Sequence, residues 1–103
     1  MGKIGSKILY DKTEIIAVDL SGKRAQALNL TYEKIISIQF DNDTVSKLFK
    51  KVPSEKISIT IRGREAPLVY YQVEEKGYWD QYKNDLTKFA KDNRVSFRNN
   101  LQG

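Results

Sequence analysis

Short apolar runs separated by turn residues fill most of the chain, and alternation with a period of two is the commonest pattern. Its clearest case is Ile57, Ile59 and Ile61, which alternate with polar residues. This alternation is typical of a strand with one buried face. Related runs predict strands over residues 7–10, 13–20, 25–31, 36–40, 57–62 and 68–73, with turns over residues 11–12, 21–24 and 62–65.

Within these strands, the sequence also predicts which side chains share a face. Ile36, Ile38 and Phe40 alternate with Ser37 and Gln39, so all three bulky groups are expected on one side of a sheet. In the second strand, alternation puts Ile16, Val18 and Leu20 on one face. Several half-buried strands of this kind indicate an antiparallel sheet.

Residues 41–54 interrupt the strand pattern. Asp41-Asn42-Asp43-Thr44 is typical of a helix cap, and the apolar residues that follow are spaced as on one helical face. We therefore predict a short helix that ends near residues 52–54. Its apolar side comprises Val45, Leu48 and Phe49, and its outer side comprises Lys47, Lys50 and Lys51.

A longer helix is predicted from Gly77 to about Asp92. Apolar residues recur there at steps of three and four: Trp79, Tyr82, Leu86, Phe89 and Ala90. Laid over an open end of a curled sheet, this stripe would cover the apolar face of the sheet and shield its edges. We expect Trp79, Tyr82, Leu86 and Phe89 to form a structural plug, with Asn93 as the C-terminal cap.

The length of 103 residues suits one domain, predicted over residues 1–103 with an ordered core at about 7–98. Cysteine and histidine are both absent. Common zinc sites, thiol nucleophiles and imidazole acid–base chemistry are therefore excluded, and no carboxylate pair is spaced as in a catalytic site. We predict a protein that is not an enzyme, without catalytic residues, metal site, cofactor or small-molecule substrate, in the cytoplasm.

The order of elements resembles that of bacterial pleckstrin-homology-like domains. The segment Thr13-Glu14-Ile15-Ile16-Ala17-Val18-Asp19 is similar to their first hairpin, Gly22-Lys23-Arg24 to the next loop, and Leu30-Thr31-Tyr32-Glu33-Lys34-Ile35 to their proline-tyrosine-x-lysine-isoleucine turn. The resemblance spans about residues 7–92. It implies a mainly β, partly open antiparallel barrel of six to seven strands, capped by a C-terminal helix.

The resemblance does not extend to phosphoinositide specificity. In lipid-binding members of the wider family, basic residues between the first two strands hold inositol phosphates. Here that loop is only Asp11-Lys12, which is short and half acidic.

Charge suggests a different candidate site. The formal net charge is +5, and in an up-and-down meander two basic segments are expected to share one rim: Lys23, Arg24, Lys47, Lys50 and Lys51. This rim is a candidate for binding anionic ligands in a salt-sensitive manner. The alternative is an ordinary solvated surface.

Aromatic residues near lysines also allow a base-stacking interpretation, but the helical spacing of Trp79 and Tyr82 favours packing in the core. Of the tyrosines, Tyr70 and Tyr78 are expected to be the most exposed.

We therefore expect a binding or assembly module that acts through protein–protein contact or self-association, using an exposed strand edge near Leu68 and Tyr70. The alternative is a peripheral binder of an anionic membrane surface, or less favourably of nucleic acid, through the basic rim.

Overall fold

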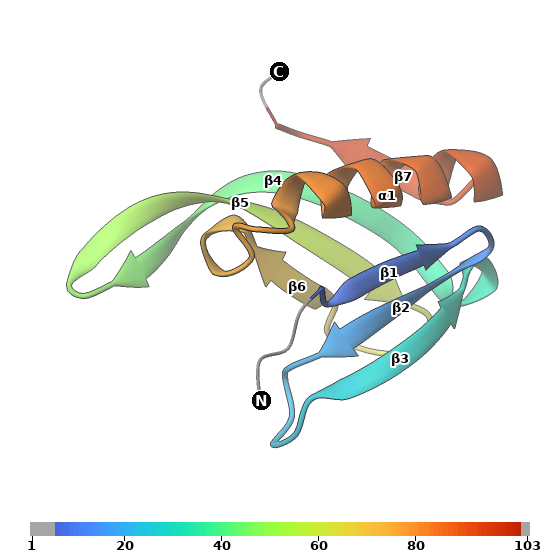
Figure 1. Ribbon diagram of the computed structural model, residues 1–103, viewed down its shortest axis with the longest axis horizontal. Helices are drawn as coiled ribbons and strands as arrows, with labels where there is room; N and C mark the ends of the chain where they lie inside the picture. Colours follow the sequence, from blue (N-terminus) through green and yellow to red (C-terminus); the bar gives the residue numbers. More distant parts are fainter. Residues whose placement is uncertain (1–5, 102–103) are drawn as a thin grey trace.

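A computed structural model describes residues 6–101. Within this range the chain forms seven strands and one long helix, joined by turns and two short 3-10 helices (Figure 1). In chain order the elements are β1 (Ile8–Asp11), β2 (Glu14–Asp19), β3 (Gln26–Thr31), η1 (Tyr32–Lys34), β4 (Ile35–Lys47), β5 (Lys50–Ile61), β6 (Leu68–Tyr71), η2 (Gln72–Glu74), α1 (Trp79–Asn93) and β7 (Ser96–Asn99).

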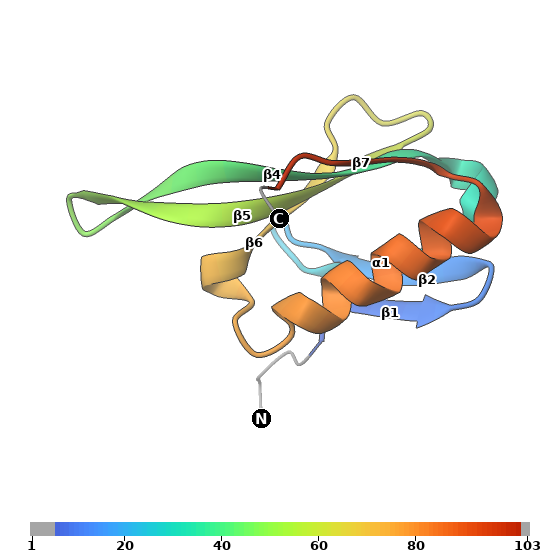
Figure 2. The same ribbon diagram turned by 90° about the horizontal axis from the view of Figure 1, so that it is seen from above.

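The strands form two sheets, one with the order β1-β2-β3 and the other with the order β6-β5-β4-β7. The two sheets lie in separate layers (Figure 2). All neighbouring strands are antiparallel except β4 and β7, which are parallel. Within residues 6–101 no ladder of paired strands joins the two sheets. The prediction of a mainly β, partly open architecture with one C-terminal helix is thus confirmed.

Helix α1 covers the open side between β1 and β7 (Figure 2). The four predicted plug residues are all buried, with exposed fractions of 3% for Trp79 and 0% for Tyr82, Leu86 and Phe89. Burying a large apolar side chain contributes about 1.5–3 kcal/mol, so this stripe is a major source of stability. The helix ends where Arg94 takes a left-handed backbone conformation, and the side-chain amide of Asn93 donates hydrogen bonds to the carbonyls of Phe89 and Lys12.

Two carboxylates, the buried Glu75 and the partly exposed Glu55, hold the start of this helix against the sheets. Glu75 accepts a hydrogen bond from the Tyr82 hydroxyl at 2.8 Å and pairs with Lys7 Nζ at 2.6 Å. Glu55 accepts hydrogen bonds from Trp79 Nε1 at 2.8 Å and from Lys83 Nζ at 2.9 Å. These contacts satisfy polar atoms that would otherwise be costly to bury.

Some of the predicted strand faces were wrong. A bulge lies between Ile35 and Ser37 in the pairing of β4 with β5, so Ile36 is 46% exposed whereas Ile35 and Ile38 are buried. In β2 the fully buried residues are Ile15 and Ala17. The face that carries Ile16 and Val18 is only partly covered.

The predicted short helix over residues 44–51 was also wrong. Strands β4 and β5 instead remain paired through Lys47 and Lys50, with Val45 opposite Val52. Three apolar residues over one and a half turns are too few to distinguish a helix from a strand and its turn. Pairing with a neighbouring strand decided the outcome. Strand β7, which lies beyond the predicted helix, was not predicted as a strand.

Candidate functional site

The β4–β5 hairpin extends beyond the rest of the molecule. Strand β7 pairs with β4 only at residues 37–40, and β6 pairs with β5 only at residues 56–59. Residues 44–53, which we call the arm, therefore form a two-stranded ribbon that projects from the body (Figures 1 and 2). An ion pair of 3.1 Å between Lys56 and Asp43 braces its base. There, hydrogen bonding to the Thr44 backbone and to Lys56 lowers the pKa of the Asp43 carboxyl below its ordinary value.

The turn of the arm places two large apolar side chains in water. Leu48 and Phe49 are the central residues between the last strand pair, Lys47 and Lys50, and their φ angles are 46° and 68°. Hairpin turns with positive φ at both central residues favour Asn-Gly. The exposed fractions are 89% for Leu48 and 108% for Phe49, so neither side chain is held in place by the core.

Three lysines surround this apolar pair. Lys47, Lys50 and Lys51 are all exposed, and in the part of the chain that the structure describes none of them forms an ion pair. We call residues 47–51 the tip. It combines unpaired positive charge with unburied apolar surface, a pairing that suits an interface between water and a less polar phase.

The predicted common rim is not formed. Lys23 and Arg24 lie exposed in the turn between β2 and β3, whereas the three other cations lie at the end of the arm. Figure 1 shows these two turns well apart. The physical reason is the arm itself, because a continuous ribbon carries the tip away from the ends of the other strands.

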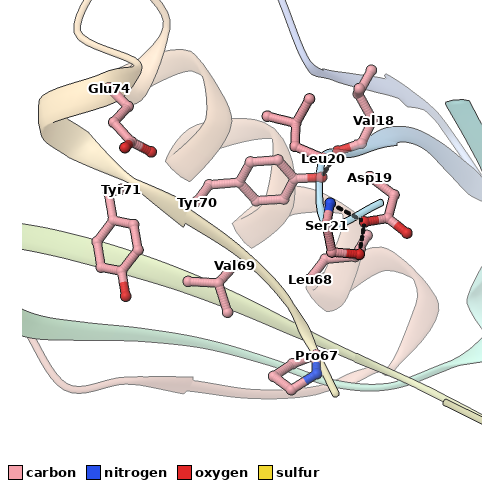
Figure 3. A pocket seen from close by; sticks show the side chains of 10 residues that line it. All are labelled: Val18, Asp19, Leu20, Ser21, Pro67, Leu68, Val69, Tyr70, Tyr71 and Glu74. Carbon is pink, nitrogen blue, oxygen red and sulfur yellow. Dashed lines mark hydrogen bonds between the residues drawn. The ribbon is translucent and has the colours of Figure 1, made fainter. Parts of the chain in front are cut away.

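A groove runs between the end of β2 and the edge strand β6 (Figure 3). It encloses about 280 Å³. Leu20 is 50% exposed at one wall and Val69 is 39% exposed at the other. The full lining is Val18, Asp19, Leu20, Ser21, Pro67, Leu68, Val69, Tyr70, Tyr71 and Glu74.

Polar contacts fix both walls of this groove. The Tyr70 hydroxyl donates a hydrogen bond of 2.6 Å to the backbone carbonyl of Val18. Asp19 accepts hydrogen bonds from Ser21 and pairs with Arg64 at 3.0 Å. The Ser21 hydrogen bonds, followed by the contact with Arg64, lower the pKa of the Asp19 carboxyl below its ordinary value.

The expected use of Leu68 and Tyr70 as exposed edge residues was wrong. Their exposed fractions are only 4% and 3%, because alternation along β6 points both side chains inward and leaves Val69 outside. The aromatic residues of α1 are packed in the core, so the packing interpretation is confirmed for Trp79 and Tyr82. Tyr78 is 37% exposed, as expected.

Sequence reasoning missed the exposure of Leu48 and Phe49, although a signal was present. Lys47 and Lys50, and then Val45 and Val52, are placed symmetrically about the Leu48-Phe49 pair. Such symmetry is what cross-strand pairing around a two-residue turn produces.

Comparison of this chain with protein-family models, with curated proteins and with solved structures found no match. No helix in residues 6–101 has the length and apolar character needed to cross a bilayer. The tip and the groove are accordingly interpreted from their own chemistry.

Proposed function

We propose that this protein is a non-catalytic binding module that docks reversibly on an anionic lipid surface through the tip of its arm. Leu48 and Phe49 enter the interfacial region of the bilayer, while Lys47, Lys50 and Lys51 contact the negatively charged headgroups. The observation that carries the proposal is the nearly complete exposure of both apolar side chains at the end of a projecting ribbon.

The energetics suit weak and reversible docking. A lysine near an anionic membrane contributes about 1 kcal/mol, and full removal of a Leu or Phe side chain from water contributes about 1.5–3 kcal/mol. Partial insertion of two such side chains beside three lysines gives an attraction that favours the bound state without making it permanent. Several copies on one surface, or a second contact, would strengthen it.

The distribution of charge favours a membrane over nucleic acid. A ribbon that follows a nucleic acid backbone needs positive charge along its length. Here the cations of the arm lie at the tip, whereas Asp41, Asp43 and Glu55 lie at or beside its base, where Lys56 is paired with Asp43. A surface that touches only the tip avoids these carboxylates, and a flat bilayer is such a surface.

The unusual turn also supports a role for these side chains. Large residues with positive φ cost of the order of 1–3 kcal/mol each, and such strain tends to occur at functional positions. Asn-Gly would form the same turn with less strain. We infer that Leu48 and Phe49 are present for what they contact rather than for the turn they form.

Vesicle co-sedimentation tests the proposal with matched variants. The wild-type protein is expected to sediment with vesicles of phosphatidylcholine containing phosphatidylserine and to remain in solution with phosphatidylcholine alone. Leu48→Asn/Phe49→Gly keeps the hairpin but removes the apolar pair, and the triple change of Lys47, Lys50 and Lys51 to Gln removes the charge. Each is expected to lower the bound fraction at least threefold, by loss of the contributions above.

The change of Lys23 and Arg24 to Gln is the matched control, because these cations lie in a different turn. This variant is expected to retain most of the wild-type binding. The proposal fails if anionic vesicles are not bound, or if the control loses as much binding as the lysine variant. Tighter binding to duplex DNA than to vesicles would identify nucleic acid as the partner instead.

A further inference from the structure

We infer that the groove between β2 and β6 is a receptor for the arm tip of a second copy of this chain, so that copies associate head to tail. This inference goes beyond membrane docking and does not depend on it. It concerns two surfaces that stay exposed in the fold: the tip, which is apolar and positively charged, and the groove, which is partly apolar and acidic.

The chemistry of the two surfaces is complementary. The tip offers the exposed side chains of Leu48 and Phe49. The groove offers the partly exposed side chains of Leu20 and Val69, together with Pro67, in a hollow of about 280 Å³. This volume is close to the lower end of the range of about 300–1,000 Å³ found for small-molecule sites, and it suits a few side chains rather than a folded element.

The charges of the two surfaces are also opposite. The tip carries three lysines, whereas the charged residues that line the groove are Asp19 and Glu74. Asp19 is already paired with Arg64. Glu74 is exposed and forms no ion pair among residues 6–101, so its carboxylate is free to meet a lysine of the incoming tip.

The geometry requires a second molecule. The arm continues the direction of β4 and β5 away from the body (Figures 1 and 2), and its base is tied by the Lys56–Asp43 ion pair. Its own tip therefore does not return to its own groove. Contact between two tips would bring three lysines against three lysines, a like-charge arrangement that disfavours a symmetric tip-to-tip dimer.

A tip-in-groove contact uses different surfaces on its two partners. In such a pair one copy keeps its groove free and the other keeps its tip free, so association can continue into chains or close into a ring. A single contact of this size is small for a stable complex. Association is thus expected only at high protein concentration, in the range of about 0.1–1 mM by analogy with weak transient interfaces.

Sedimentation equilibrium with two complementary variants tests the inference. The tip variant is Leu48→Asn/Phe49→Gly, and the groove variant is Leu20→Gln/Val69→Gln. Both keep the net charge, and the groove positions are partly exposed, so the groove variant is expected to fold, which circular dichroism checks. The wild-type protein is expected to exceed its monomer mass of 11.9 kDa as its concentration rises, whereas each variant alone stays at that mass.

An equimolar mixture of the two variants is the decisive sample. The tip of the groove variant can still enter the groove of the tip variant, so the mixture is expected to form a species of twice the monomer mass and to grow no further. The inference is overturned if the wild-type protein stays monomeric at 1 mM, if either variant associates alone as the wild type does, or if the mixture does not associate.

The same variants separate this inference from the proposed membrane function. The groove variant is expected to lose self-association and to keep its binding to vesicles that contain phosphatidylserine, because its tip is unchanged. The tip variant is expected to lose both. Loss of vesicle binding in the groove variant would contradict the independence of the two sites, and vesicle binding without self-association in the wild type would leave only the membrane proposal.

Discussion

The hydroxyl of Tyr70 donates a hydrogen bond of 2.6 Å to the backbone carbonyl of Val18 and thereby joins the edge strand of one sheet to the central strand of the other. No ladder of paired strands joins the two sheets within residues 6–101. This contact therefore ties the two sheets together at the groove that both residues line.

Replacing Tyr70 with Phe keeps the buried ring and removes this link. The carbonyl of Val18 then loses its partner on this side, so the free energy of unfolding is expected to fall by about 1–3 kcal/mol. Urea denaturation monitored by circular dichroism measures the change. A Tyr70→Phe variant as stable as the wild type would show that this hydrogen bond between the two sheets contributes nothing to the free energy of unfolding.

Alkaline pH is expected to destabilise the protein through Tyr82. Burial raises the pKa of Tyr82 to about 12, from an ordinary value of 10.0. Because the folded state holds this proton more tightly, its stabilising effect is complete below pH 10 and is lost as the pH rises from 10 to about 12. Burial also raises the pKa of Tyr70, which adds to the same trend.

Denaturation series from pH 8 to pH 11 measure this effect. The wild-type free energy of unfolding is expected to fall above pH 10, and Tyr82→Phe, although less stable at pH 8, is expected to fall less steeply. Equal slopes for the two proteins would contradict the assignment to Tyr82.

The Leu48→Asn/Phe49→Gly variant is expected to be more stable than the wild type, unlike most substitutions. Asn and Gly accept positive φ at a two-residue turn with less strain, so a gain of about 1 kcal/mol is expected in the stability of the hairpin. Amide hydrogen exchange of the arm residues reports this gain directly. Faster exchange in the variant would show that Leu48 and Phe49 stabilise the turn and would weaken the argument for a binding role.

Truncation of the helix stripe is expected to be costly. Leu86 is fully buried against the core, and Leu→Ala changes at such positions cost about 2–5 kcal/mol through lost contacts and the cavity left behind. Gln81 lies on the exposed face of the same helix, so Gln81→Ala is a control expected to change stability by less than about 0.5 kcal/mol. Thermal unfolding of the two variants compares them, and similar losses would contradict the plug assignment.

Prediction of the core from sequence worked where the pattern was long. The alternation of Ile57, Ile59 and Ile61 and the stripe from Trp79 to Ala90 both correspond to buried faces in the structure. In each pattern at least three apolar residues recur at one regular spacing. That spacing places them on a single face of the strand or helix, which is then buried against the core. The resemblance to pleckstrin-homology-like domains remains a prediction, because no comparison bears on it.

Prediction of secondary structure and of buried faces failed where few residues formed the pattern. It also failed where pairing with a neighbouring strand determined the conformation. Val45, Leu48 and Phe49 fit a helical face and a hairpin turn equally well. The exposure of Ile36 depends on a bulge. The candidate rim failed for a related reason, because the position of Lys47 relative to Lys23 depends on how far the arm extends.

By itself, the sequence determined the fold class, the position of the helix and the absence of cysteine and histidine chemistry, since these follow from periodicity and residue inventory. Only the tertiary structure decided that Leu48 and Phe49 stand in water between lysines and that a groove opens between β2 and β6. The projection of the tip depends on where the pairing of β6 and β7 with the β4–β5 hairpin ends, and the groove depends on how the two sheets pack against each other. Local sequence preference encodes neither.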